Sequence, residues 1–388
     1  MRCTFNQDGA CFAVARMNGS NRGFTVYTTS PYRETFGRVF RDGGVARAEM
    51  LFRCNILALV GGGDEPKFSP NKVMIWDDHQ GRCIGELAFK VPVRGVRLRR
   101  DKIVVALEHK VFVYQFSNLE LEQQLDTSSN VEGLCVISPT TETTVMACPG
   151  LNTGQVRVEL FDLGTTKFIA AHEAPLACLA LSADGRLLAT ASEKGTLIRV
   201  FDTIKARLLH EFRRGSDRAK IYSLAFSPRN NLLGATSDKG TVHVFRIPDS
   251  ATAPTSYASA SPAPLSSSAA ARASGAASTS SSTVASILGQ NKFVKSLLPK
   301  YFRSEWSMAQ FKLATTTRSV VSFPITDSDT IVVVSETGEF ARLVFDDVAG
   351  GVMRCVESHN FAIATPPATD TSATSHTRAN TRATDSYP

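Results

Sequence analysis

The chain has 388 residues, of which 43 are Lys or Arg and 36 are Asp or Glu, giving a formal net charge of +7. This excess favours an anionic surface but is too small for a protein that coats nucleic acid, so no nucleic-acid partner is expected. Hydrophobic residues make up 43% of the chain, enough for a sizeable core. No stretch reaches the roughly 18 uninterrupted apolar residues of a membrane span.

The N-terminal residues and the cysteines indicate the compartment. Residues 1–9 contain no apolar signal-peptide core, so we expect the protein to be cytoplasmic. The eight cysteines are scattered, with no C-x-x-C pair and no histidine at metal-ligand spacing. Most lie within apolar runs, which favours reduced core packing, and neither a metal site nor a cofactor is expected.

A two-strand unit recurs along the chain. In each copy an apolar run ends at a glycine or polar turn, and a second β-rich run follows, often with an aromatic residue near its end. The second runs are residues 23–27, 72–76, 110–114, 155–161, 196–201, 241–245 and 339–345. The two best copies, 189–202 and 235–245, begin about 45 residues apart, near the period of propeller blades. Seven units predict an all-β seven-bladed β-propeller over residues 1–363, with almost no helix.

The fifth unit ends with two adjacent arginines. Apolar and polar side chains alternate through residues 206–215, which predicts a short strand closed by a turn at Gly215. Successive side chains of a strand point to opposite faces, so Arg213 and Arg214 cannot both enter one groove. Guanidinium groups bind phosphate in a bidentate way, which favours two adjacent phosphate pockets. The alternative for any isolated arginine pair is a solvated, charged strand edge that discourages aggregation.

Hydroxyl and imidazole side chains accompany this pair in the sequence. Four hydroxyl residues stand at equivalent positions of two consecutive blades beside Lys-Gly turns: Ser192, Thr196, Ser237 and Thr241. Hydroxyls and turn amides complement arginine around a phosphate, although each alone is an ordinary turn residue. His172 lies where WD-type repeats carry a turn-ordering histidine, so a structural role and a phosphate contact both stay open. His243 alternates with two valines and therefore points away from the side that they bury.

Residues 249–307 interrupt the repeat between the sixth and seventh units as a long insertion. Residues 251–282 are almost entirely Ser, Ala, Thr, Pro and Gly, which predicts disorder. Residues 286–299 show a helical apolar pattern with lysines on the other side, typical of a short helix in a membrane interface. We assign membrane insertion to Ile287, Leu288, Phe293, Val294, Leu297 and Leu298. The alternative is a loop whose apolar end packs on the propeller rim. Residues 364–388 are predicted to be a disordered tail.

No motif indicates catalysis. The glycines at 61–63 are followed by Asp64, Glu65 and Pro66, without the Gly-Lys-Ser/Thr of a phosphate-binding loop. This triplet is therefore interpreted as a turn after a strand. Neither Gly-x-Ser-x-Gly nor His-Glu-x-x-His occurs, so the protein is not expected to be an enzyme.

Several segments together resemble one known family. Residues 51–63, 70–78, 189–201, 212–215 and 298–302 are similar to those of the PROPPINs, the WIPI-type phosphoinositide-binding propellers of autophagy. The likeness extends from about Cys3 to Phe345 and is closest to the shorter WIPI branch, which includes the fungal SVP1-like proteins. It implies binding of phosphatidylinositol 3-phosphate and 3,5-bisphosphate at two rim sites flanking residues 212–215. It also implies that residues 249–307 form a membrane-contact loop.

The resemblance further implies the residues of each site. The first site would use Thr190, Ser192, Gly195, Thr196, Arg199 and Arg213, with His172 nearby. The second would use Arg214, Ser237, Thr241 and His243, with Gly215 shaping the turn. The implied partners are phosphoinositide-containing membranes and autophagy proteins such as the bridge-like lipid-transfer protein of the phagophore. The protein would be a monomer, peripheral on phagophore, endosomal and vacuolar membranes.

Two features depart from the family pattern. The strand before the first unit is expected to be short or absent, which leaves closure of the ring open. The insertion is longer and richer in Ser and Ala than in the animal members. The alternative function is a lipid-independent WD-repeat scaffold whose faces bind only proteins.

Overall fold

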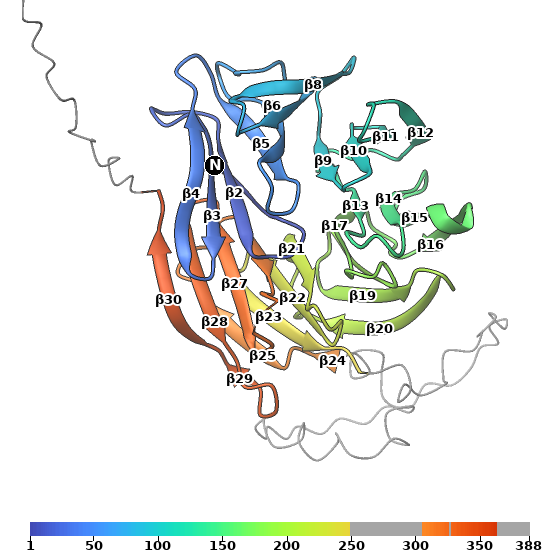
Figure 1. Cartoon of the computed structure of the whole chain (residues 1–388). Helices are drawn as coiled ribbons and strands as arrows, with labels where there is room; N and C mark the ends of the chain where they lie inside the picture. The colour runs from blue at the N-terminus through green and yellow to red at the C-terminus, as the bar shows by residue number, and fades with distance from the viewer. Residues whose placement is uncertain (249–304, 326, 363–388) are drawn as a thin grey trace, which may run out of the picture.

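The computed structural model describes residues 1–248, 305–325 and 327–362. Seven β-sheets, each a blade, are arranged in a ring (Figure 1). The predicted disordered stretch 251–282, the apolar stretch 286–299 with its six proposed insertion residues, and the tail 364–388 lie outside the described residues.

Each blade is built from four antiparallel strands in chain order, and blades five and six each gain a short, parallel fifth strand. Blade one has β1 (Arg2–Phe5), β2 (Cys11–Arg16), β3 (Gly23–Thr29) and β4 (Tyr32–Val39); blade two has β5 (Val45–Met50), β6 (Ile56–Gly61), β7 (Lys72–Asp77) and β8 (Arg82–Ala88). Blade three has β9 (Gly95–Leu98), β10 (Lys102–Ala106), β11 (Lys110–Gln115) and β12 (Leu121–Asp126); blade four has β13 (Val136–Ile137), β14 (Val145–Pro149), β15 (Gln155–Leu160) and β16 (Thr165–Ala170).

The remaining three blades follow in chain order. Blade five has β17 (Leu176–Leu181), β18 (Leu187–Ser192), β19 (Leu197–Asp202) and β20 (Arg207–Arg213), with β24 (Glu305–Trp306) added at its edge. Blade six has β21 (Ile221–Phe226), β22 (Leu232–Ser237), β23 (Thr241–Arg246) and β25 (Ala309–Lys312), with β29 (Gly351–Val352) at its edge. Blade seven has β26 (Ser319–Ser322), β27 (Thr330–Ser335), β28 (Glu339–Val344) and β30 (Arg354–Asn360). The short strands β24 and β29 come from the segments before β25 and before β30. The seven predicted runs are the third strands of the seven blades, which confirms the predicted propeller.

The core lies between neighbouring blades, because each blade buries both of its faces. In blade five, Ile198 and Val200 belong to the cluster shared with blade six, in which the rings of Phe212 and Phe245 lie 5.1 Å apart. Leu188, on the opposite face of the blade, packs against blade four. A strand buried on both faces needs apolar residues at nearly every position, which is why these segments are rich in Val, Ile, Leu and Ala. Alternation along a strand therefore decides which neighbouring blade a side chain meets.

The ring closes through side-chain packing between blades one and seven. Strand β1 is present with four residues, and both blades are assembled from their own end of the chain, so neither lends a strand to the other. The ring of Phe12 in blade one stacks on that of Phe340 in blade seven, with centroids 5.9 Å apart. The Cys3 thiol donates a hydrogen bond to the Ser335 carbonyl oxygen across the same interface. Figure 1 shows the first and last blades side by side.

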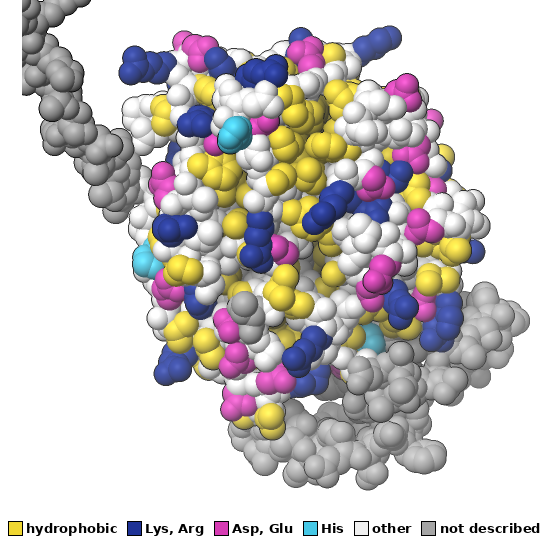
Figure 2. All heavy atoms as spheres, viewed as in Figure 1, with side chains coloured by type: hydrophobic (Ala, Val, Ile, Leu, Met, Phe, Trp, Pro, Cys, Tyr) yellow, Lys and Arg dark blue, Asp and Glu magenta, His cyan; other side chains and the backbone are white. Residues whose placement is uncertain are grey.

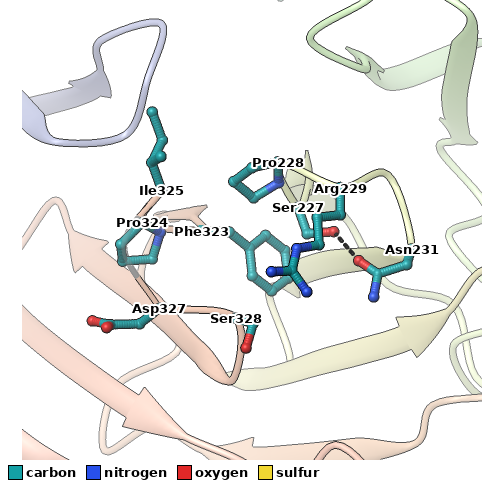
Figure 3. Close-up of a pocket in the computed structure, with 9 residues that line it drawn as sticks. All are labelled: Ser227, Pro228, Arg229, Asn231, Phe323, Pro324, Ile325, Asp327 and Ser328. Atoms are coloured by element: carbon teal, nitrogen blue, oxygen red, sulfur yellow. Dashed lines mark hydrogen bonds between the residues drawn. The ribbon is translucent and has the colours of Figure 1, made fainter.

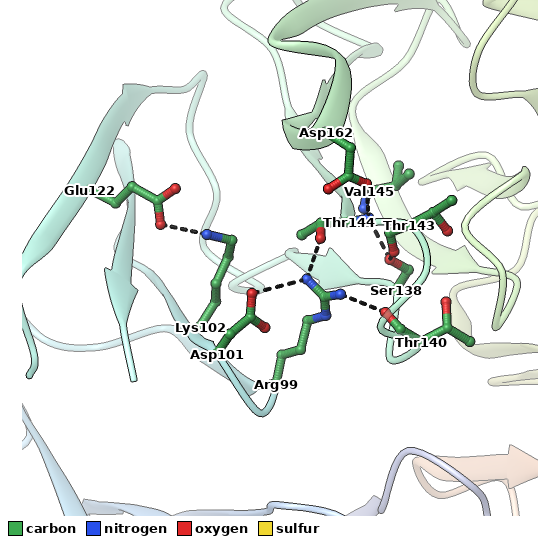
Figure 4. A network of polar contacts seen from close by, with 10 residues as sticks. All are labelled: Arg99, Asp101, Lys102, Glu122, Ser138, Thr140, Thr143, Thr144, Val145 and Asp162. Carbon is green, nitrogen blue, oxygen red and sulfur yellow. Dashed lines mark hydrogen bonds and ion pairs between the residues drawn. The ribbon is translucent and has the colours of Figure 1, made fainter. Parts of the chain in front are cut away.

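A buried arginine joins blades three and four (Figure 4). Arg99, only 3% exposed, donates hydrogen bonds to the Thr144 hydroxyl and the Thr140 carbonyl oxygen, both at 2.5 Å, and pairs with the Asp101 carboxylate at 3.3 Å. Three acceptors around one guanidinium compensate the cost of removing the charge from water. This contact therefore fixes the orientation of blade four against blade three.

The described residues contain almost no helix and no disulfide bond. The described residues contain a single 3-10 turn, Phe161–Leu163, and no helix among them is long and apolar enough to cross a membrane. All eight cysteines are free thiols, and five of them are buried. Burial raises the pKa of the Cys3 and Cys148 thiols to about 12. These two cysteines are therefore protonated packing residues at neutral pH, as predicted for reduced core cysteines.

Candidate functional site

Arg213 and Arg214 lie at the end of β20 and diverge. Phe212 faces blade six, where its ring meets that of Phe245. Arg213 is the last residue of the strand, so its side chain lies on the opposite face, toward blade four. Arg214 returns to the side of blade six, where its charge acts on His243. One strand end thus directs a guanidinium to each of two neighbouring grooves.

The groove between blades four and five contains three of the residues that the resemblance implies. The Nε2 atom of His172 lies 2.9 Å from the hydroxyl oxygen of Thr190, which is fully buried. Arg199 donates one hydrogen bond to the Glu211 carboxylate at 2.9 Å and another to the Ala171 carbonyl oxygen at 2.6 Å. Burial and the Arg199 charge lower the pKa of His172 to about 4. His172 is therefore neutral at physiological pH, and Arg199 is already held by a carboxylate.

The groove between blades five and six contains a buried arginine and a buried histidine. Arg214 is 8% exposed, and it donates from Nε to the Gly195 carbonyl oxygen at 3.0 Å and from Nη2 to the Asp217 carbonyl oxygen. The Nδ1 atom of His243 lies 3.1 Å from the Ser307 hydroxyl oxygen. Burial and the Arg214 charge lower the pKa of His243 to about 4. The hydrogen bonds that Arg214 makes to described residues go to neutral carbonyl oxygens, and the carboxylates of Asp238 and Asp217 act on its charge from nearby.

Two tight turns bring the serines to these grooves. Ser192 ends β18 and Ser237 ends β22, and each carbonyl oxygen accepts a hydrogen bond from the amide of the glycine three residues later. Gly195 and Gly240 have φ of +61° and +63°, a region that favours glycine. A Cβ atom on Gly195 would also lie 1.7 Å from the Ala219 carbonyl oxygen. The Lys-Gly turns are therefore required by the backbone.

The two threonines and Gly215 differ from the pattern expected from sequence. Thr241 begins β23, whereas Thr196 stands one residue before β19, because blade five has an additional residue, Leu197, at the start of that strand. Gly215 is not among the residues with positive φ, and a Cβ atom there would meet no heavy atom within 4 Å. The turn therefore does not require glycine at 215, and the missing side chain leaves open space beside Arg214.

Residues 305–307 complete this rim, and the sequence analysis did not identify them. Glu305 and Trp306 form β24, which runs parallel to β20 with Trp306 opposite Arg213. Trp306 is 50% exposed, and Ser307 contacts His243. These residues follow a low-complexity stretch and show no strand pattern, so the tryptophan at 306 is the one sequence signal that could have indicated them. The chain that follows residues 249–304 is thereby fixed beside the arginine pair.

Two further features are the charge on the face seen in Figure 2 and a second pocket. On the face seen in Figure 2, Lys and Arg side chains are interspersed with Asp and Glu. A separate pocket lies between the turns of blades six and seven (Figure 3), lined by residues that include Arg229 and Asp327. It adjoins the opposite end of β22 from Ser237, so it is distinct from the rim. Among the described residues, no three His, Cys, Asp or Glu side chains converge as a metal site.

The fold and the arginine pair define a seven-bladed β-propeller with two adjacent arginines on its rim. Comparison with known proteins identifies its family. The PROPPIN family model matches residues 2–287. The chain belongs to the PROPPIN family. No enzyme family is indicated.

Relatives cover most of the chain. Autophagy-related protein 18e of Arabidopsis thaliana is 39% identical over 347 residues, covering 88% of this chain and 84% of that protein. SVP1-like protein 2 of Pichia angusta is 37% identical over 322 residues, covering 81% of each.

Solved structures share the fold. Kluyveromyces lactis Hsv2 matches with a TM-score of 0.67 and 24% identity, covering 92% of this chain and 98% of that one. KlAtg21, solved in complex with the coiled-coil of AgAtg16, matches with a TM-score of 0.69 and 23% identity over the same shares. At this identity the two structures support the architecture alone.

Proposed function

We propose that this PROPPIN is a non-enzymatic phosphoinositide effector in autophagy. It binds phosphatidylinositol 3-phosphate and 3,5-bisphosphate through the two grooves flanking residues 212–215. The observation that carries the proposal is the divergence of Arg213 and Arg214 from one strand end. Guanidinium matches phosphate geometry, and two grooves allow two headgroups to bind one rigid rim.

In the groove between blades four and five, Arg213 supplies the charge for the phosphate. Arg199 has a different role, because its Nε and Nη1 atoms are engaged by Glu211 and Ala171. It fixes the groove wall, while His172 and Thr190 hold each other at 2.9 Å. A neutral imidazole and hydroxyl beside a guanidinium can orient a phosphate without repelling it.

In the groove between blades five and six, Arg214 is pre-oriented. Its Nε and Nη2 atoms bind carbonyl oxygens, so Nη1 is the nitrogen that a headgroup phosphate would engage. Ser237 lies on the same face of β22 as Leu233 and Ala235, which pack against blade five. His243 is opposite Ala235 in the sheet, so it faces blade five as well. A side chain already held by the protein loses little entropy on binding, which favours affinity.

The rim and the insertion act together at the membrane. Each charge-assisted contact between arginine and phosphate contributes about 1.5–3 kcal/mol, and each Lys or Arg near an anionic leaflet adds roughly 1 kcal/mol. Two linked headgroup contacts increase avidity through effective concentration. The described chain resumes at Glu305 and Trp306, beside the end of β20, which supports a joint action of the arginine pair and the six proposed insertion residues.

The bound propeller would recruit autophagy partners through its other blades. The proposed membranes are those of the phagophore, endosomes and vacuole, and the proposed protein partners include the bridge-like lipid-transfer protein of the phagophore. A related propeller, KlAtg21, was solved with a coiled-coil segment of AgAtg16, which supports simultaneous protein recruitment.

Vesicle flotation of the full chain tests the proposal. We expect co-flotation with vesicles that contain phosphatidylinositol 3-phosphate or the 3,5-bisphosphate, and none with charge-matched vesicles made with phosphatidylserine. The lipid-independent scaffold predicts the same recovery in both preparations. Equal recovery would therefore reject the lipid-site assignment and favour the scaffold.

A further inference from the structure

A cavity of about 530 Å³ runs along the centre of the ring, apart from the rim grooves. The seven inner strands surround it: β1, β5, β9, β13, β17, β21 and β26. Its volume lies within the roughly 300–1,000 Å³ of typical small-ligand sites. The channel can therefore hold a small molecule without rearrangement of the blades.

Four arginines line this channel, and two of them make no hydrogen bond or ion pair within the described part of the chain. Arg97 pairs with Glu49 at 3.2 Å. Arg318 pairs with Glu132 at 3.4 Å and with Glu336 at 3.5 Å. The side chains of Arg2 and Arg47 make no hydrogen bond or ion pair with any described residue, although both line the cavity.

The carboxylates of the channel are already engaged. Glu49 is bound by Arg97, and Glu132 is bound by Lys220 at 2.6 Å as well as by Arg318. The remaining lining carboxylate, Asp8, pairs with Arg53 at 2.7 Å. Glu336 and Glu132 also act on Arg2, but both carboxylates pair with Arg318, so the four arginines leave an excess of positive charge inside the ring.

The lowered pKa of Arg47 reflects burial and the positive charge around it in the channel. Burial, together with the charges of Arg2 and Arg97, lowers the pKa of Arg47 to about 9. Arg47 is still protonated at neutral pH, so it is a half-buried cation close to other cations. Uncompensated charge of this kind is expensive unless a counter-charge is supplied.

We propose that the central channel binds a small soluble oxyanion of the phosphate class, held by Arg2 and Arg47. Guanidinium groups bind phosphate oxygens in a bidentate way, and a multiply charged anion compensates both unpaired arginines at once. The site is enclosed by the seven inner strands, which favours a free phosphate compound over a lipid headgroup anchored in a bilayer. The site is independent of the rim grooves.

Thermal unfolding of the full chain with pyrophosphate tests this site. A ligand that binds only the folded state raises the unfolding midpoint in a saturable way. We expect this rise in the natural protein and in Arg33→Gln, a control at an exposed position of β4. Arg47→Gln should bind pyrophosphate at least tenfold more weakly in isothermal titration, and its midpoint without ligand should be equal or higher, because a buried repulsion is removed. Sodium chloride of equal ionic strength serves as the salt control.

Three results would overturn the proposal. The first is no midpoint rise in the natural protein beyond that of the salt control. The second is an unchanged affinity in Arg47→Gln or, should that variant not fold, in Arg2→Gln. The third is loss of the pyrophosphate effect in the double variant Arg213→Gln with Arg214→Gln, which would assign the anion to the rim.

Discussion

Neutralising Arg213 and Arg214 separately and together tests whether each arginine serves its own headgroup. We consider Arg213→Gln, Arg214→Gln and the double variant, because glutamine keeps a polar side chain and removes the charge. The two arginines face different neighbouring blades, because they occupy successive positions at the end of one strand. Independent sites lose binding free energy additively, whereas two groups on one ligand do not.

The expected losses follow from the strength of charge-assisted hydrogen bonds. Each single variant removes about 1.5–3 kcal/mol of headgroup binding, which corresponds to roughly 10- to 150-fold in affinity. The double variant should lose about 3–6 kcal/mol, or roughly 10²- to 10⁴-fold. Titration with vesicles containing phosphatidylinositol 3-phosphate measures the three affinities, and flotation of the double variant should fall to background.

Folding has to be separated from binding for Arg214. Arg214 is 8% exposed and bonded to the Gly195 and Asp217 carbonyl oxygens, so Arg214→Gln should also lower the free energy of unfolding by roughly 1–3 kcal/mol. Urea denaturation measures this loss, and binding is compared well below the unfolding midpoint. Arg207→Gln is the matched control, because Arg207 is an exposed arginine of the same strand.

Either of two outcomes would contradict the assignment of one headgroup to each arginine. If Arg207→Gln weakens vesicle binding as much as the rim variants do, the effect is general surface charge. If the double variant loses no more than one single variant, both arginines contact one headgroup, and the two-groove arrangement is wrong.

The remaining predictions concern the rim, pH and closure of the ring. Trp306 is 50% exposed and Trp76 is 7% exposed. Tryptophan emission should therefore shift to shorter wavelength when the protein binds phosphoinositide vesicles, because Trp306 enters the membrane interface. Trp306→Phe should abolish the shift, and a shift that persists would assign it to Trp76. His243 has a pKa lowered from 6.5 to about 4 in the folded protein, so its contribution is complete above pH 6.5 and should fall by up to about 3 kcal/mol as the pH drops toward 4. His243→Gln should reduce the slope of unfolding free energy against pH in this window without abolishing it, because the pKa of His172 is lowered to about 4 as well; an unchanged slope would contradict the assignment. Phe12→Ala should cost about 3–5 kcal/mol in urea denaturation, because Phe12 is fully buried where blades one and seven meet; a loss below about 1 kcal/mol would show that packing there does not close the ring. Replacing residues 249–304 by a Gly-Ser linker of equal length should preserve the unfolding midpoint and the affinity for a soluble headgroup while weakening vesicle binding, and unchanged vesicle binding would exclude a membrane role for the loop.

Local sequence predicted the number of blades and the third strand of each. The recurring apolar runs predicted the third strand of every blade, because alternation and β-branched residues act within a few positions of one another. The same local rule predicted that Arg213 and Arg214 diverge, since side chains alternate along any regular strand. Family membership was also readable from short segments such as residues 212–215.

Contacts between distant segments were decided only by the tertiary structure. The pairing of Trp306 with Arg213 joins residues separated by the long insertion, and no local pattern encodes it. Sequence likewise could not show that Arg199 is held by Glu211 and the Ala171 carbonyl, or that Gly215 has an ordinary φ. Arg2 and Arg47 line one channel because the inner strands of different blades surround the same axis. Which charges are compensated depends on these long-range approaches, and packing of the whole ring sets them.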